Sequence, residues 1–177
     1  MRVLIGFVFM LVSMGTSFGV EEAFARTAPG EIEVKVLPAG RLLENHGAGE
    51  SYFEQSGRLF GPLFSYIKAH NISMTTPVEA SIEPGMMAFW VASGQEDRAE
   101  EASGDVQVRD VPERKVAAIG ARGGYSRNNF EEARDQLLVW MEEQGELSVV
   151  GEPFAVYWNG PMTPWFLKTF EVMVEVE

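Results

Sequence analysis

The chain has 177 residues, of which 46% are hydrophobic and 11% aromatic, which is enough for one compact domain with a substantial core. Its formal net charge is −12, so it would repel a phosphate backbone, and no nucleic-acid partner is expected. The sequence contains no cysteine, which excludes disulfides, thiolate metal ligands and a cysteine nucleophile.

The N-terminal residues are typical of an export signal. One arginine is followed by an uncharged run over residues 3–20, whose apolar centre has the length of a signal-peptide core. Small residues allow cleavage after Gly19 or, later, after Ala25. The alternative is an uncleaved anchor, since the 18 uncharged residues reach the lower limit for spanning a bilayer. We expect residues 1–19 to be removed, leaving a periplasmic or secreted protein without stable membrane insertion.

The first half of the remaining chain predicts a strand, a helix and two more strands. Apolar and charged residues alternate over 31–36 with the period of a half-buried strand. Apolar residues recur at mostly helical spacings from 51 to 70, where Gly61-Pro62 is expected to kink the helix or restart it. Residues 74–80 form the next predicted strand. The continuous apolar run 86–92 fits a central strand covered on both faces.

The second half repeats this order after a polar loop. Its predicted elements are strands at 106–110 and 115–121, a helix at 128–144, and strands at 149–158 and 166–176. The helix has a capping-box-like start at Asn128 and Glu131 and a stop at Gly145. Two helices and about eight strands in two similar halves predict an α+β fold, a distorted open antiparallel β-barrel with the helices packed outside.

Two short segments carry the strongest functional signal. They are Met74-Thr75-Thr76-Pro77-Val78, after the first helix, and Gly160-Pro161-Met162-Thr163-Pro164-Trp165, before the last strand. Proline restricts its own φ and the residue before it, so the second segment is expected to be a stiff loop that presents apolar side chains. In this order, about eighty residues apart, the two segments resemble those of the SOUL haem-binding family. The resemblance extends over most of the chain from Val20 onward.

The resemblance implies one SOUL-like domain over residues 20–177, and it relates the fold to gyrase-inhibitor-like and effector-binding domains. It also implies that a monomer binds haem or a related tetrapyrrole non-covalently, for carriage or buffering. The expected site is an apolar groove between the first helix and the Pro161–Lys168 loop. Its expected residues are Leu63, Phe64 and Ile67 from the helix and Met162, Trp165, Phe166 and Lys168 from the loop.

These groove residues also have simpler interpretations. The helix residues Phe64 and Ile67 can be ordinary core, and Trp165 and Phe166 can fold back over the core as a lid. Lys168 is suited to meet a propionate of the porphyrin.

Axial ligation of the haem iron would fall to His46, His70 or a methionine, because cysteine is absent. His46 follows the first strand in a flexible context and is the candidate metal ligand, with a solvated loop residue as the alternative. His70 ends the first helix, where the helix dipole favours an imidazolium, so a capping role is expected. Family members without a ligating histidine hold haem by packing alone.

Two other functions stay open. The sequence has no nucleophile elbow, His-Glu-x-x-His motif, phosphate loop or dinucleotide-binding glycine motif, so a binding protein is expected rather than an enzyme. An enzyme acting on a small hydrophobic molecule would need Glu171 to converge with Tyr125 or Tyr157. The other alternative is an effector-binding or interaction module, because a buried acidic residue in the late strands of such relatives contacts cationic ligands. Alternation with valines instead predicts a solvent-facing Glu171.

Overall fold

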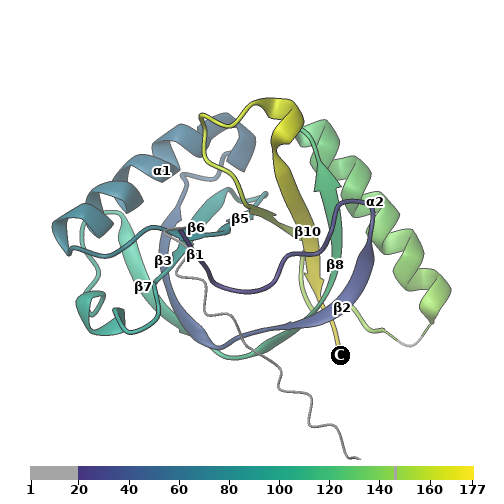
Figure 1. The fold of residues 1–177 in the computed structure, drawn as a ribbon, viewed down its shortest axis with the longest axis horizontal. Helices are drawn as coiled ribbons and strands as arrows, with labels where there is room; N and C mark the ends of the chain where they lie inside the picture. The colour runs from purple at the N-terminus through teal and green to yellow at the C-terminus, as the bar shows by residue number, and fades with distance from the viewer. Residues whose placement is uncertain (1–19, 146) are drawn as a thin grey trace, which may run out of the picture.

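One antiparallel sheet of eight strands forms the body of the protein in the computed structural model, which describes residues 20–145 and 147–177. The sheet curls into an open barrel, and two helices lie along its outside (Figure 1). This arrangement confirms the predicted α+β fold class. No helix in the described ranges is long and apolar enough to cross a membrane. The predicted export signal at residues 1–19 lies outside the described residues and stays a prediction.

Apart from the short strands β1 and β4, which pair with each other, the elements fall into two halves with the same order. The first half contains β1 (Glu21–Glu22), β2 (Ile32–Leu37), β3 (Gly40–His46), α1 (Tyr52–Ala69), β4 (Thr75–Thr76), β5 (Val78–Ser81) and β6 (Met86–Trp90). The second half contains β7 (Val106–Val111), β8 (Arg114–Arg122), α2 (Arg127–Gln144), β9 (Phe154–Tyr157) and β10 (Thr169–Glu175). Short 3-10 turns occur at η1 (Glu96–Arg98) and η2 (Trp165–Leu167).

The sheet joins the two halves so that neither is a separate domain. Its strand order is β2-β8-β10-β9-β5-β6-β3-β7. This order is symmetric when each strand is exchanged for its counterpart in the other half, β2 for β7, β3 for β8, β5 for β9 and β6 for β10. Strand β2 of the first half pairs with β8 of the second, and β7 of the second half pairs with β3 of the first. The two halves are therefore interlocked in one sheet.

Both helices form near their predicted positions. Helix α1 is continuous through Pro62, where the sequence predicted a kink or a restart. Its buried face packs into the core, and this packing outweighs the hydrogen bond that proline removes. The predicted start of α2 at Asn128 is wrong: the helix begins at Arg127, and its N-cap is Ser126, whose hydroxyl accepts from the Asn129 amide. The predicted stop is confirmed, because the helix ends at Gly145 with a left-handed φ of 69°.

Several strand boundaries differ from the prediction. Strand β3 was missed, because its buried Glu44 and Asn45 interrupt the apolar alternation. The strand predicted at residues 74–80 is divided at Pro77, which has no N–H to donate to a ladder. Strand β10 begins at Thr169, after the η2 turn, and not at the predicted residue 166.

The inner face of the barrel is filled by the protein's own N-terminal segment, residues 23–31. This segment crosses the barrel between β1 and β2 (Figure 1). The ring centroid of Phe24 lies 5.7 Å from that of Trp90 and 5.5 Å from that of Trp158, edge-on to both. The inner face thus has its own packed clusters, separate from the larger core beneath the helices.

The prediction of a solvent-facing Glu171 is wrong, because this residue is completely buried inside the barrel. Its carboxylate accepts hydrogen bonds from the Thr27 amide at 3.0 Å, Lys35 Nζ at 2.6 Å and Trp158 Nε1 at 2.8 Å. The sheet curls around the N-terminal segment, so both faces of β10 are covered. In a strand covered on both sides, alternate side chains point to two different buried regions, so alternation does not show which residues face solvent.

Strand β2 reverses the expected faces for the same reason. Lys35 points inward toward Glu171, whereas Val34 and Val36 are 39% and 53% exposed on the other face of this edge strand. The alternating pattern identified the strand correctly. The expectation that its apolar side chains face the interior and its charged ones face solvent was wrong. The buried carboxylate determines which side of β2 faces the barrel.

We expect Lys35→Met to lower the free energy of unfolding by about 3 kcal/mol, because it leaves the buried Glu171 carboxylate without its cation. The double variant Lys35→Met/Glu171→Gln should lose less unfolding free energy, because it removes the unpaired carboxylate charge as well. Urea denaturation measures both. Arg58→Met, which breaks an exposed ion pair with Glu50, is the control and should change little. Equal losses in Lys35→Met and Arg58→Met would contradict this account.

Candidate functional site

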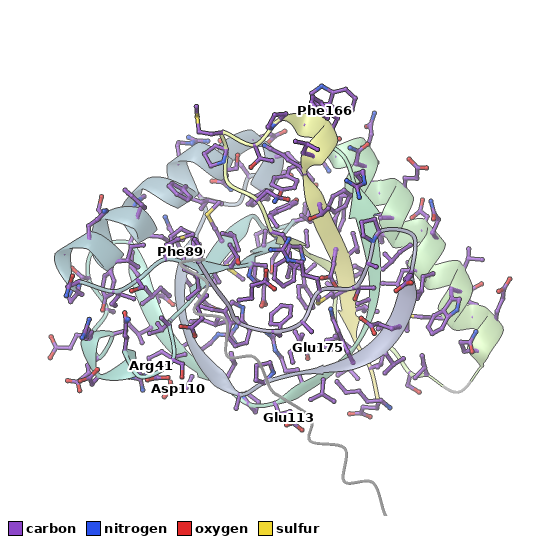
Figure 2. The ribbon with its side chains drawn as sticks, viewed as in Figure 1. Arg41, Phe89, Asp110, Glu113, Phe166 and Glu175 are labelled. Carbon is purple, nitrogen blue, oxygen red and sulfur yellow. The ribbon has the colours of Figure 1, made fainter. Side chains whose placement is uncertain are left out.

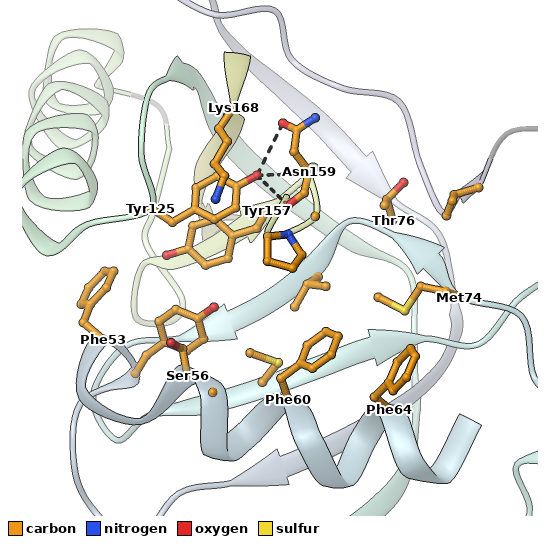
Figure 3. Close-up of a pocket in the computed structure, with 17 residues that line it drawn as sticks. Phe53, Ser56, Phe60, Phe64, Met74, Thr76, Tyr125, Tyr157, Asn159 and Lys168 are labelled. Carbon is orange, nitrogen blue, oxygen red and sulfur yellow. Dashed lines mark hydrogen bonds between the residues drawn. The ribbon is translucent and has the colours of Figure 1, made fainter. Parts of the chain in front are cut away.

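A pocket of about 590 Å³ opens on the outer side of the sheet, between α1 and the start of the Pro161–Lys168 loop (Figure 3). Its volume is typical of small-molecule sites, which occupy about 300–1,000 Å³. The lining residues are Val20, Tyr52, Phe53, Ser56, Gly57, Phe60, Phe64, Met74, Thr76, Val78, Met87, Tyr125, Tyr157, Asn159, Gly160, Pro161 and Lys168. The lining is mainly apolar and aromatic.

One face of helix α1 forms one wall of the pocket. Phe53, Phe60 and Phe64 follow one another along this face, and the rings of Phe60 and Phe64 are stacked with centroids 5.5 Å apart (Figure 3). Gly57 lies between Phe53 and Phe60, and a Cβ added to it would meet no atom within 4 Å. The missing side chain at Gly57 therefore leaves part of the pocket open.

Tyr125 and Asn159 form the opposite wall and fix the base of the loop. The Tyr125 hydroxyl accepts from the Asn159 amide at 2.8 Å and donates to the Thr169 carbonyl, 3.0 Å away (Figure 3 shows the Tyr125–Asn159 contacts). Asn159 Oδ1 accepts from the Thr169 amide at 2.7 Å. These bonds tie the end of β9 to the start of β10, so the intervening loop is held at both ends.

The pocket tyrosines are neutral at physiological pH. Tyr157 lies between Tyr52 and Tyr125, with ring centroids 5.5 and 4.2 Å away. Burial raises the pKa of Tyr125 to about 12. Burial, with the neighbouring Tyr52, raises the pKa of Tyr157 well above its ordinary value. These phenols give the pocket a polarisable, uncharged wall.

Lys168 is the only residue with a formal charge among the described residues that line the pocket. Its Nζ lies 4.8 Å from the centroid of the Tyr125 ring, a cation–π contact that holds the ammonium at the rim. The pocket can therefore receive an apolar body while offering one cation to an anionic substituent.

The predicted groove residues divide into three groups. Phe64 and Lys168 line the pocket. Leu63 and Ile67 are buried in the core beneath α1, which is the alternative considered for Ile67 from the sequence. The loop residues Met162, Trp165 and Phe166 are exposed and do not line the pocket, nor do they fold back over the core as a lid.

The two histidines lie away from this pocket. His46 is the last residue of β3, its ring is half exposed and 3.2 Å from Glu44, and it lines a separate groove with Pro84. His70 stacks on Tyr66, and its Nδ1 is 2.9 Å from the Tyr66 carbonyl, which agrees with the expected capping role at the end of α1. Within residues 20–145 and 147–177, no group of three or more His, Cys, Asp or Glu could hold a metal ion.

Sequence reasoning missed several pocket residues. Phe53 and Phe60 belong to the apolar residues of the helix predicted at 51–70 but were not assigned to the groove, although this apolar stripe is wider than a single packing face requires. That excess width was the available signal. Asn159 had no signal in the sequence, because its role depends on hydrogen bonds to Tyr125 and Thr169, which are distant in the chain.

The chain belongs to the SOUL heme-binding protein family. The family profile described as "SOUL heme-binding protein" matches residues 19–175, nearly the whole chain. The family resemblance seen in the two short proline-containing segments is thereby confirmed. No curated protein matches the chain significantly.

Solved structures with a similar fold have low sequence identity. The C-terminal domain of EcmrR aligns with a TM-score of 0.66 at 15% identity, over 83% of this chain and 97% of that one. In the EcmrR–DNA complex the TM-score is 0.66 at 14% identity, over 83% of this chain, but this chain spans only 57% of EcmrR. At these identities the similarity extends to the fold alone.

Two further structures align over a comparable length. A hydrolase from Listeria innocua has a TM-score of 0.56 at 10% identity, over 85% of this chain and 94% of that one. SAV2435 bound to tetraphenylphosphonium has a TM-score of 0.52 at 11% identity, over 83% of this chain and 94% of that one. Proteins of different kinds therefore share this fold.

We expect Tyr157→Phe to leave stability unchanged or raise it by up to about 1 kcal/mol. The reason is that the Tyr157 hydroxyl is buried and has no hydrogen-bond partner among the described residues. Tyr125→Phe is the matched variant and should cost about 1–2 kcal/mol, because the Asn159 amide and Thr169 carbonyl lose their partner. Urea denaturation compares them, and a larger loss in Tyr157→Phe would show that this hydroxyl is hydrogen-bonded after all.

Proposed function

We propose that this protein binds haem or a related tetrapyrrole non-covalently in the pocket between α1 and the Pro161–Lys168 loop, for carriage or buffering. The observation that carries the proposal is the pocket itself, an apolar, aromatic cavity with one cation, where the family resemblance implied a groove. An exported monomer, periplasmic or secreted, suits such a carrier.

The lining residues fit a porphyrin. A porphyrin is a flat apolar disc with two carboxylates, so it needs aromatic and aliphatic walls and a cation at the edge. Phe60 and Phe64 on the α1 side and Tyr125 on the opposite side supply the walls. Lys168 supplies the cation at the rim, where a propionate would remain close to water.

Packing, and not an axial histidine, is the proposed mode of binding. His46 lines a different groove and contacts Glu44, so its proposed ligation would require haem to lie elsewhere. Haem supplies an iron centre when bound, but the residues described here serve to surround the macrocycle, exclude water and neutralise a propionate. Residues that only enclose and neutralise the ligand suit a carrier more than an enzyme.

The effector-binding alternative is less favoured because of Glu171. A domain that binds cationic ligands needs an unpaired carboxylate. Glu171 is already paired with Lys35, whose Nζ lies 2.6 Å from the carboxylate inside the barrel. Phe24 also occupies the space between Trp90 and Trp158 on this side. A lipophilic cation of the kind bound to SAV2435 would have to displace both contacts.

The enzyme alternative required Glu171 and a tyrosine to converge. Glu171 contacts Lys35 and Trp158 on the inner face of the sheet, whereas Tyr125 and Tyr157 line the pocket on the outer face. The sheet therefore lies between the proposed acid and base groups. We propose that the pocket binds its ligand without chemical conversion.

The central experiment fills the pocket from Gly57. We expect Gly57→Leu to weaken hemin binding by about tenfold or more, since the new side chain occupies space that the ligand needs. Gly61→Leu is the matched control, because Gly61 lies one turn later in α1, also has open space at its Cβ, and does not line the pocket. Gly57→Leu should keep or raise stability, since leucine favours a helix over glycine. Gly61 precedes Pro62, which disfavours a side chain in the helical region there, so thermal unfolding is used to establish that both variants are folded.

Hemin titration followed by the Soret band and tryptophan quenching measures these affinities. The protein used begins at Val20, so it includes every described strand and helix and all but one residue of the family match. Saturable one-to-one binding that Gly57→Leu weakens and Gly61→Leu does not is the expected result. Binding that does not saturate, or equal affinities for the two variants, would overturn the proposal.

Two further variants test the residues outside the pocket. We expect His46→Ala to leave the Soret position unchanged, because the proposed site does not use this imidazole. Trp165→Ala should change affinity much less than Gly57→Leu, because Trp165 is exposed outside the lining. A Soret shift lost in His46→Ala would instead establish axial ligation and move the site to the other groove.

A further inference from the structure

We propose that the loop residues Met162, Trp165, Phe166 and Leu167, here called the apolar tip, insert into the interfacial layer of a phospholipid bilayer. The tip lies outside the pocket, so this inference does not depend on what the pocket binds. The protein would accordingly have a membrane-docking surface as well as a ligand site.

The exposure of the apolar tip is the first observation. Met162 is 93% exposed, Trp165 70%, Phe166 55% and Leu167 53%. Figure 2 shows Phe166 at the outer edge of the molecule, beyond the strands. Four large apolar side chains adjacent in one short loop form a protruding patch, whereas single exposed hydrophobic residues need no explanation.

The loop holds this patch in a fixed shape. The Thr163 amide donates to the Gly160 carbonyl at 3.1 Å, and the Leu167 amide donates to the Pro164 carbonyl at 2.9 Å. The Trp165 and Phe166 rings meet edge-on with centroids 5.8 Å apart. Because the loop is already ordered, inserting its side chains into a bilayer costs little further conformational entropy.

The charge around the apolar tip favours a phospholipid surface. The neighbouring segments 122–130 and 159–170 contain no Asp or Glu, although the whole chain has a net charge of −12. They lie side by side, because the Gly123 amide donates to the Lys168 carbonyl at 2.9 Å. Arg122 and Lys168 therefore lie at the base of the tip. Arg122 does not line the pocket and can meet lipid phosphates while the rest of the protein stays in water, whereas the Lys168 ammonium stays at the pocket rim.

A bilayer fits the tip better than a protein partner does. The four side chains expose on the order of 500 Å², which is less than the roughly 800 Å² that each partner of a stable protein interface buries. The patch is also a projection and not a groove. Tryptophan with flanking basic residues is the composition that suits the boundary between headgroups and acyl chains.

The test measures binding of protein beginning at Val20 to vesicles of phosphatidylcholine, with and without phosphatidylglycerol. We expect Trp165→Ser/Phe166→Ser to reduce vesicle binding by about tenfold or more, because it removes most of the inserted apolar area. The matched control is Val139→Ser/Val150→Ser, which removes two valines that are 56% and 53% exposed elsewhere on the surface. It should bind as the wild type does, and thermal unfolding confirms that both variants are folded.

A second measurement detects insertion of the apolar tip into the bilayer. Brominated phosphatidylcholine should quench tryptophan fluorescence of the wild type and not that of Trp165→Phe, since Trp90 and Trp158 are buried and the partly buried Trp140 lies near the end of α2 that is remote from the tip. Arg122→Gln should weaken binding only to vesicles that contain phosphatidylglycerol. At high salt, this variant and the wild type should bind such vesicles equally.

Three results would overturn the proposal. The first is no vesicle binding by the wild type, and the second is equal binding by wild type and Trp165→Ser/Phe166→Ser. The third is self-association in sedimentation experiments that the same double variant abolishes, which would assign the apolar tip to a second copy of the chain. Each result is independent of hemin titration in solution, so this proposal and the proposed pocket function can fail separately.

Discussion

The buried Glu171 carboxylate is the constraint on which the rest of the structure depends. A fully buried carboxylate is tolerated only when it is neutralised and hydrogen-bonded, and here its donors are Thr27, Lys35 and Trp158. Thr27 comes from the N-terminal segment, Lys35 from edge strand β2, and Trp158 directly follows β9. Their bonds to Glu171 fix the N-terminal segment across the barrel, where Phe24 packs between two tryptophans. The barrel interior is thus occupied by the protein itself.

Ligand space consequently lies outside the barrel, between α1 and the loop that leads into β10. This loop has two sides with different roles. Pro161 and Lys168 at its ends line the pocket, and the four residues of the apolar tip between them project outward. The Tyr125 and Asn159 hydrogen bonds hold the base of the loop and so fix both sides relative to the sheet. In the two proposals, a poorly soluble ligand would be bound next to the surface that docks on a membrane.

The architecture was predictable from the sequence, whereas the faces of its strands were not. Periodicity located both helices and Gly145 marked the end of α2, because these signals are local. Curling of the sheet is not local, so the Glu171 and Lys35 side chains were expected in solvent and are found inside. For the pocket, the groove expected from the two proline-containing segments shares Phe64 and Lys168 with the observed lining. Leu63 and Ile67 could not be distinguished from pocket residues, since both faces of α1 are apolar and only packing decides which is buried.

The most direct test of the central claim is NMR of the protein labelled at methionine methyl groups, titrated with a diamagnetic tetrapyrrole such as zinc protoporphyrin. Met74 and Met87 line the pocket, Met173 is buried on the inner face, and Met162 lies on the apolar tip. The account predicts saturable ring-current shifts of the Met74 and Met87 methyl signals, with Met173 unchanged. Shifts of Met173 without Met74 and Met87 would place the ligand inside the barrel and contradict the account.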